Sequence, residues 1–309
     1  PPPPPPPPPP PFFFQPHAGI RDCLLSRGLG DVYKRQWMEK ARASGADALV
    51  FDLEDSVPNA EKERARELVA GEIGRHKAEH GLLYVRINKG RYLHDIADIY
   101  AVAKRGLSGL FVPMVEGIED MQFLSNILSE LEDKQDIAIG TFGLIVALET
   151  AKSAHVAFEI AQFARVQAIV ACTAKNADVA RNLGFIWTVE GLETLHFRSR
   201  SIIASRAAGK QYPIGGLWQD VHDLDGLRAF AKFNRQLGFS GEIVLHPSNV
   251  PIVNEVYALS LEDKEYYEGM IKAFEIAETR GKGAVMYEGE HIDIAHYTTA
   301  KQILNKNYD

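Results

Sequence analysis

The chain has little cysteine, no long apolar run and no excess of positive charge. Only two of its 309 residues are cysteines, Cys23 and Cys172, and they are too far apart in the sequence for a metal-binding pair. This excludes a disulfide scaffold and fits a reducing cytoplasm. No apolar stretch reaches the roughly 18 residues needed to cross a membrane. The net charge of −7 gives no basic surface for nucleic acid.

The first 36 residues differ from the rest. Eleven prolines and three phenylalanines open the chain, and the segment shows neither helical nor strand periodicity. It also lacks the basic start and apolar core of a signal peptide. A proline-rich ligand arm is one interpretation. We favour another, because FFFQ…GIRD and CLLSRGLGDVYKRQ resemble the translation of sequencing-adapter DNA fused to a truncated gene. We therefore expect residues 1–36 to be non-native or disordered, with the natural protein resuming near Trp37.

After Trp37, short apolar stretches alternate with amphipathic helical patterns, which predicts βαβ units and a parallel sheet. We expect seven strands, over 48–52, 82–87, 109–113, 143–148, 166–172, 213–216 and 242–245. A TIM (β/α)8 barrel needs eight. The sequence thus predicts an α/β fold, a TIM barrel over residues 37–260 that lacks its native first strand. An open doubly wound sheet is the alternative.

The last stretch, 261–309, has a different pattern. A helix is expected near 263–280, followed by the glycine-rich link GKG at 281–283, two short strands around AVMYEGEHI and a final helix. We interpret it as a C-terminal helical and β-hairpin flap that serves oligomerisation.

The run ALVFDLEDSV is the most informative stretch. It reads as a buried strand with Asp52, Glu54 and Asp55 at its C-terminal end. In an α/β barrel the catalytic groups lie on the loops after the strands. A cluster that caps the next helix is the alternative. The same pattern recurs in YVRIN, which ends near Arg86, and in GLIVALET, which ends near Glu149. This recurrence favours a site.

Glu149 and Asp178 are the metal candidates, because Mg²⁺ takes one or two protein carboxylates and leaves its other positions to water and substrate. Asp178 could instead cap the helix that it begins. Arg86 is the anion candidate, since a guanidinium pairs a carboxylate with two bonds. It could also form a structural salt bridge to Asp52 or Glu54. Both roles are compatible if these acids hold the arginine in place.

Eight segments of the chain follow one another in the order found in a known group of enzymes. They are DLEDSV, VRIN, VPMVEG, ALET, DVARNLG, RSRSIIASRAAG, GFSGEIVLHPSNVPIVNE and GAVMYEGEHIDIAHYTTAKQIL. Over about residues 40–309 the chain resembles the citrate lyase beta-subunit-like proteins of the HpcH/HpaI aldolase/citrate lyase superfamily, with malyl-CoA lyase as a close relative. The resemblance implies a Mg²⁺-dependent TIM barrel, a homotrimer or homohexamer, that makes or breaks a carbon–carbon bond next to an acyl-CoA thioester.

By motif, the resemblance implies that Glu149 and Asp178 hold Mg²⁺ and that Arg86 binds the substrate, an acyl-CoA with a small carboxylic acid. Asp293 in HIDIAH matches a catalytic acid that the C-terminal segment lends to a neighbouring subunit. Three features depart from the family pattern: the arginine-bearing first strand and its loop are missing, residues 175–178 read KNAD, and position 114 is Met114. The last two support one alternative, a catalytically silent paralogue that binds acyl-CoA. A class II 2-keto acid aldolase that acts without CoA is the other alternative.

Overall fold

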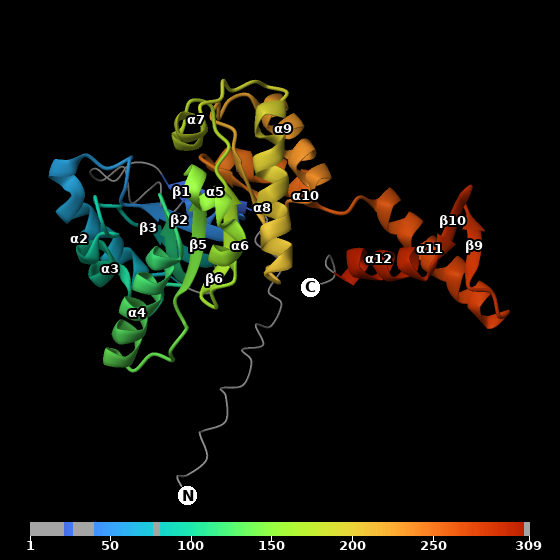
Figure 1. Ribbon diagram of the computed structural model, residues 1–309, viewed down its shortest axis with the longest axis horizontal. Helices are drawn as coiled ribbons and strands as arrows, with labels where there is room; N and C mark the ends of the chain where they lie inside the picture. Colours follow the sequence, from blue (N-terminus) through green and yellow to red (C-terminus); the bar gives the residue numbers. More distant parts are fainter. Residues whose placement is uncertain (1–21, 27–39, 77–80, 306–309) are drawn as a thin grey trace, which may run out of the picture. The chain divides into compact units, whose positions relative to one another are not determined.

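The computed structural model describes residues 22–26, 40–76 and 81–305. This part of the chain forms two compact units, one ending at Ala258 and one beginning at Leu259 (Figure 1). No helix among the described residues is long and apolar enough to cross a membrane.

Parallel strands form the centre of the larger unit. They are β1 Asp22–Ser26, β2 Ala48–Asp52, β3 Leu82–Arg86, β4 Gly109–Val112, β5 Gly143–Leu148, β6 Val166–Ala171, β7 Ile214–Leu217 and β8 Gly241–Val244. From β2 to β8 each strand pairs in parallel with the next along the chain. Strand β1 pairs with both β2 and β8, so the eight strands close into a barrel. The predicted α/β fold with a parallel sheet is confirmed.

Strand β1 lies within the segment for which no strand periodicity was found. Residues Asp22–Ser26 pair with Ala48–Phe51 on one side and with β8 on the other. The sequence predicts no native first strand before Trp37, and the structure fills this position of the sheet with Asp22–Ser26. Backbone groups make the ladder of hydrogen bonds, so a segment can join a sheet without the side-chain pattern of a strand. The rest of residues 1–36 lies outside the described residues.

Helices follow most strands and cover the outside of the sheet (Figure 1). They are α2 Lys62–Ile73, α3 Ile96–Val102, α4 Ile118–Lys134, α5 Ala151–His155, α6 Ala157–Ala161, α7 Asp178–Leu183, α8 Leu195–Ala207, α9 Leu224–Leu237 and α10 Val250–Tyr257. Between β5 and β6 the chain forms two short helices, α5 and α6, which meet at Val156 instead of forming one continuous helix.

Both faces of the strands are buried, as a parallel sheet covered by helices requires. Residues such as Leu83 and Val85 pack towards the helices, whereas their neighbour Tyr84 packs inside the barrel. The Tyr84 hydroxyl donates a hydrogen bond to Gln167 in this interior. Gly143 makes room for that contact, because a Cβ there would lie 2.2 Å from the Gln167 side chain. Side chains alternate between the two faces of each strand and so fill two separate layers of the core, one under the helices and one inside the barrel.

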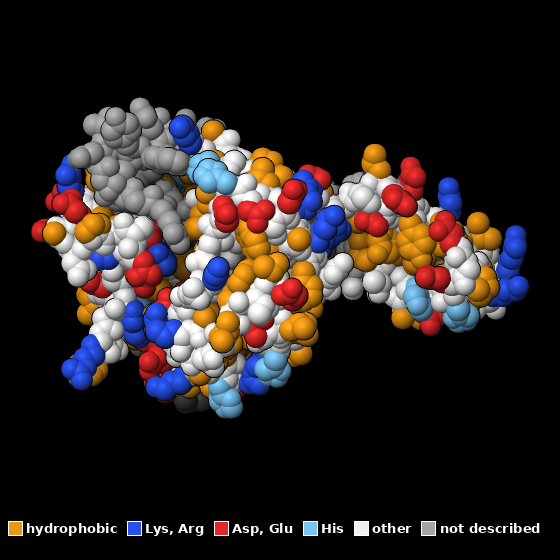
Figure 2. All heavy atoms as spheres, turned by 90° about the horizontal axis from the view of Figure 1, so that it is seen from above, with side chains coloured by type: hydrophobic (Ala, Val, Ile, Leu, Met, Phe, Trp, Pro, Cys, Tyr) orange, Lys and Arg blue, Asp and Glu red, His pale blue; other side chains and the backbone are white. Residues whose placement is uncertain are grey.

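The smaller unit has its own core. Helix α11 Leu261–Thr279 packs against the hairpin of β9 Ala284–Tyr287 and β10 Glu290–Asp293 and against α12 Ile294–Asn305. Met270, Phe274 and Ile292 are buried among tyrosines. Large apolar side chains remain exposed on it, namely Leu261, Ile276, Met286 and Ile294. Figure 2 shows hydrophobic side chains at the surface of both units, interspersed with acidic and basic ones.

A proline in β1 tests whether this strand belongs to the fold. We expect Leu24→Pro to lower the free energy of unfolding by about 1–3 kcal/mol, because a proline cannot donate to the ladder and leaves a carbonyl of a neighbouring strand unpaired. Leu24→Val keeps the N–H and is the control. Denaturant titration measures both. An unchanged midpoint in the proline variant would show that β1 contributes nothing to stability.

Candidate active site

An arginine held by acids forms one side of the site. Arg86 ends β3 beside Asp52, which ends β2, and the two residues are paired in register. Nε and Nη2 of Arg86 donate to the two Asp52 carboxylate oxygens at 2.7 and 2.6 Å. Nη1 lies 2.8 Å from Glu54 Oε2 and 3.9 Å from Asp55 Oδ2. The structural salt bridges considered for Arg86 are thus present with both acids. Two of the five guanidinium N–H groups remain for another partner.

The loop after β2 is fixed by its own hydrogen bonds. Asp52 accepts from the backbone N–H of Glu54 at 2.9 Å and from the Ser56 hydroxyl at 2.6 Å. Lys62, which begins helix α2 beyond this loop, donates to the carbonyl oxygens of Leu53 and Glu54 at 2.8 and 2.7 Å. Asn88, two residues after Arg86, donates to Leu53 O at 2.8 Å. These bonds explain how the loop holds several carboxylates close together.

The three acids of this loop are not equivalent. Burial alone would raise the pKa of Asp52, but the hydrogen bonds and charge of Arg86 lower it below its usual range. Glu54 is also beside Arg86, yet burial and the neighbouring carboxylates raise its pKa to about 8. The opposite directions of the two pKa shifts agree with the geometry, because Asp52 accepts two hydrogen bonds from the guanidinium, whereas Glu54 only forms an ion pair with Nη1. Asp55 is exposed.

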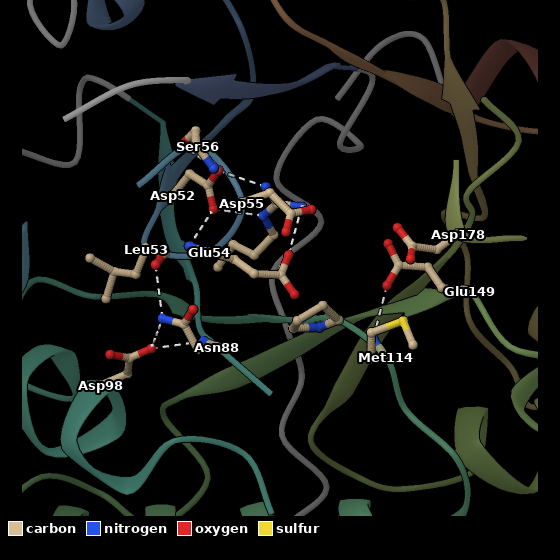
Figure 3. Close-up of polar contacts among 12 residues, drawn as sticks. Asp52, Leu53, Glu54, Asp55, Ser56, Asn88, Asp98, Met114, Glu149 and Asp178 are labelled. Atoms are coloured by element: carbon tan, nitrogen blue, oxygen red, sulfur yellow. Dashed lines mark hydrogen bonds and ion pairs between the residues drawn. The ribbon is translucent and has the colours of Figure 1, made fainter. Parts of the chain in front are cut away.

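Glu149 and Asp178 form the other side of the site. Figure 3 shows their carboxylates side by side, with Glu149 following β5 and Asp178 beginning α7. Oε2 of Glu149 accepts a hydrogen bond from the backbone N–H of Met114 at 2.9 Å. Burial raises the pKa of Glu149, and the negative charge of Asp178 adds to this effect. Asp178 does not cap α7 through its side chain, because Ala177 is the N-cap residue.

The turn after Glu149 fixes its backbone. Thr150 is the N-cap of α5 and forms a capping box with Ser153, in which each side chain accepts from the other residue's backbone N–H. The Thr150 hydroxyl also donates to Val115 O at 3.0 Å, which ties this turn to the loop after β4. In that loop, Met114 has a left-handed backbone with φ of 48°. Such strained positions in non-glycine residues occur at functional sites.

One cavity of about 120 Å³ joins the two sides. Arg86 and the acids Asp55, Glu149 and Asp178 line it, together with the half-buried Cys172. Burial raises the pKa of this thiol, which hydrogen-bonds to Glu149. Within the described residues no group of three His, Cys, Asp or Glu side chains could hold a metal ion.

Asp293 belongs to the smaller unit. It ends β10, and its Oδ1 lies 2.6 Å from Nδ1 of His296 and accepts from the backbone N–H of Ala295 at 3.0 Å. The hydrogen bond from His296 lowers the pKa of Asp293, which is exposed. Its role in catalysis stays a prediction.

Sequence reasoning missed several residues that position the site. Asn88 lies in the VRIN motif, but its amide was not recognised as a partner of the neighbouring loop. The sequence signal that could have identified Asn88 is its position two residues after Arg86, in the loop that follows β3. Thr150 and Ser153 could have been read as a capping box from their spacing alone. The backbone N–H of Met114 could not have been found, because every residue type carries one.

Comparison with known proteins agrees with this architecture. The sequence model of the HpcH/HpaI aldolase/citrate lyase family matches residues 32–247. A (3S)-malyl-CoA thioesterase of Cereibacter sphaeroides is 30% identical over 273 residues, covering 88% of this chain and 90% of its own. The citrate lyase beta subunit of Leuconostoc mesenteroides is 29% identical over 260 residues, covering 84% and 85%.

Solved structures share the fold. CitE from Mycobacterium tuberculosis, in complex with magnesium, acetoacetate and coenzyme A, superposes with a TM-score of 0.73 at 24% identity and covers 94% of this chain and 99% of its own. A citrate lyase from Burkholderia xenovorans gives 0.78 at 17% identity, covering 94% and 92%. With the family match and the curated relatives, these likenesses lead to one conclusion: the chain belongs to the HpcH/HpaI aldolase/citrate lyase family of enzymes.

Proposed function

We propose that the protein is a Mg²⁺-dependent lyase that breaks or forms a carbon–carbon bond next to an acyl-CoA thioester. The observation that carries this proposal is the pair Glu149 and Asp178 beside Arg86 in one cavity. Candidate substrates are citryl-CoA, malyl-CoA and related 3-hydroxyacyl-CoAs. The names of the curated relatives, a malyl-CoA thioesterase and a citrate lyase beta subunit, support acyl-CoA chemistry.

The residues present fit magnesium. Carboxylate oxygens are hard donors, and Mg²⁺ uses one or two of them with water and substrate oxygens completing its shell. Glu149 and Asp178 would hold the ion. Glu149 in particular is half-buried beside the second negative charge of Asp178, and its Oε2 accepts a hydrogen bond from the backbone N–H of Met114. When bound, the ion supplies positive charge that polarises a carbonyl and lowers the pKa of a hydroxyl group.

In the cleavage direction, the 3-hydroxyl group loses its proton and becomes a carbonyl. The bond between C2 and C3 breaks, its electron pair forms the enolate of the shorter acyl-CoA, and C2 of that enolate takes up a proton. Arg86 has two free N–H groups, which would bind the carboxylate of the hydroxyacid and stabilise developing negative charge. Asp52 and Glu54 would orient Arg86, and Asp55 would border the cavity. Asp293 would relay the proton.

The wider architecture of the proposal follows the family. We propose a TIM (β/α)8 barrel over 37–260 in which β1 substitutes for the native first strand, and a flap over 261–309 that reaches a neighbouring subunit in a homotrimer or homohexamer. The exposed Leu261, Met286 and Ile294 support a contact for this flap, since exposed apolar side chains gather at interfaces. The cytoplasmic location also stays a prediction.

Thioester hydrolysis is the second candidate, because one curated relative is a malyl-CoA thioesterase. The direct test incubates the protein and Mg²⁺ with a panel of 3-hydroxyacyl-CoAs and separates the products. A lyase releases a shorter acyl-CoA and a carbonyl compound, whereas a thioesterase releases free CoA and the intact hydroxyacid. Binding without either product would favour the silent paralogue, and cleavage of 2-keto acid aldols without CoA would favour the class II aldolase.

Glu149→Gln tests the metal site without an activity assay. We expect Mg²⁺ affinity, measured by titration calorimetry, to fall at least ~100-fold, since even residues that only support a ligand cost 10–100-fold. The metal-free variant should melt at a higher temperature than the wild type at pH 8, because the raised pKa means that ionised Glu149 destabilises the fold. This advantage should vanish below the ordinary carboxyl pKa. Glu116→Gln, an exposed carboxylate paired with Lys152, is the control and should change neither result.

Arg86→Lys tests the anion site. We expect the fold to persist and kcat/KM to fall at least ~100-fold, because a point charge cannot reproduce the bidentate fork. Arg228→Lys is a matched control, since Arg228 makes a similar two-bond pair with Glu255 at the surface, at 2.7 and 2.9 Å. Circular dichroism checks the fold of both. Unchanged turnover in Arg86→Lys would mean that this arginine is only structural.

Mixed oligomers test Asp293. Subunits with Asp293→Ala and subunits with Glu149→Ala should each be inactive, but their mixture should regain part of the activity. Some sites would then combine an intact barrel with an intact flap from a neighbour. Each variant mixed with itself is the control, and mass spectrometry confirms subunit exchange. No recovery after confirmed exchange would mean that Asp293 acts within its own chain or not at all.

A further inference from the structure

The loop after β4 carries the backbone group that reaches the metal candidates. The N–H of Met114 donates to Glu149 Oε2 at 2.9 Å, and Figure 3 shows this contact beside Asp178. The carbonyl oxygen of the same peptide group belongs to Pro113. It lies 2.9 Å from Nε2 of His94, which follows β3. One peptide group therefore bridges the side chains of His94 and Glu149.

The surroundings of His94 make this contact a defined hydrogen bond. The side chain is fully buried. Since a carbonyl oxygen can only accept, Nε2 carries the hydrogen and donates it to Pro113 O. Burial lowers the pKa of His94 to about 4, so the ring is neutral at ordinary pH and Nδ1 has no hydrogen. Within the described part of the chain Nδ1 has no hydrogen-bond partner, so the bond to Pro113 is the one that orients the ring.

The loop that carries His94 is itself held in place. Lys89 and His94 face each other as an antiparallel bridge, and the N–H of Gly90 donates to Leu93 O at 2.9 Å. The Lys89 ammonium also donates to Asp120 Oδ1 in the first turn of α4. His94 therefore has a fixed position from which it can hold the loop after β4.

Two more side chains hold the next residues of the loop after β4. The Thr150 hydroxyl donates to Val115 O at 3.0 Å, and Asp120 Oδ2 accepts from the backbone N–H of Glu116 at 2.8 Å. Side chains from the loop after β3, from α4 and from the turn after β5 thus contact the backbone of each of residues 113–116.

The strained backbone of Met114 shows why such support is needed. Its φ of 48° lies in the left-handed region, where a non-glycine residue persists only if its surroundings over-determine the conformation. The peptide group before Met114 is planar, so the direction of its carbonyl sets the direction of its N–H. Loss of the bond to Pro113 O would free this peptide group to turn and would take the N–H away from Glu149.

We propose that His94 is a positioning residue for the metal site, because it holds the Pro113 carbonyl and thereby directs the N–H of Met114 at Glu149. This inference rests on the proposed Mg²⁺ site and adds a residue that acts only through Glu149. A carboxylate that is already oriented by a hydrogen bond binds a metal ion more tightly than one that must be ordered on binding.

Hydrogen exchange in the metal-free protein tests the positioning directly. His94→Leu removes the donor, so we expect the Met114 amide to exchange at least ~10-fold faster while the amides of β4 keep their protection. His94→Gln can donate from its side-chain amide and should restore slow exchange. His76→Leu is the matched control, because Nε2 of His76 lies 2.8 Å from Gly81 O at the opposite end of β3. Unchanged Met114 exchange in His94→Leu, or no rescue by glutamine, would overturn the inference.

Mg²⁺ affinity tests the consequence for the site. Titration calorimetry should show a loss of ~10-fold in His94→Leu, since residues that support a metal ligand contribute about 10–100-fold. His94→Gln should retain most of the affinity, and His76→Leu all of it. Faster exchange at Met114 without any loss of affinity would refute a role at the metal site. If the wild type binds no Mg²⁺, the proposed lyase function fails, whereas the exchange measurement still decides whether His94 directs the Met114 N–H.

A measurement on the wild type covers the case in which His94→Leu does not fold. NMR of the imidazole nitrogens distinguishes the two neutral forms of the ring. We expect His94 to carry its hydrogen on Nε2, because Pro113 O can only accept. A neutral ring with its hydrogen on Nδ1 would mean that the bond to Pro113 does not form, and the inference would be wrong.

Discussion

The ion pair between Arg86 and Asp52 is the interaction on which the site depends. It joins the ends of two neighbouring strands and is largely removed from water. Loss of one partner from such a pair leaves an uncompensated buried charge, which is strongly destabilising. The same pair fixes the direction of the guanidinium, so that its remaining N–H groups are available to the cavity. Stability and substrate recognition therefore rely on one contact between β2 and β3.

Around this pair the protein gathers more negative charge than it neutralises. Burial is the main cause that raises the pKa of Glu54 and of Glu149, and the neighbouring carboxylates add to it. Bringing like charges together costs stability, and the hydrogen bonds from Lys62 and Asn88 to the loop backbone hold the loop that carries Glu54 in spite of that cost. A bound cation would relieve the repulsion. The cluster of carboxylates is therefore suited to bind a cation.

The central strands could be predicted from the sequence because burial on both faces makes them continuously apolar. Strands 48–52 and 143–148 agree with the structure at both ends. The grouping of Glu149 with Asp178 followed from the same rule, since parallel strands end at one rim. Other features depend on tertiary context. The break between α5 and α6 at Val156, the brace from Asn88 and the left-handed backbone of Met114 leave no periodic signal. Strand β1 lies in the segment where no native strand was expected, and its place in the sheet is defined by backbone pairing.

That pairing gives the barrel an unusual property at one position. Between β2 and β8 lies a slot that the segment Asp22–Ser26 fills. Without a segment in this slot, the facing edges of β2 and β8 would have unpaired backbone N–H and C=O groups. Peptide groups are common to all sequences, so the slot selects for length and extended geometry more than for particular side chains. At this point the barrel is therefore held together by an extended backbone that pairs with a strand on each side, and a proline there would remove a donor from the ladder.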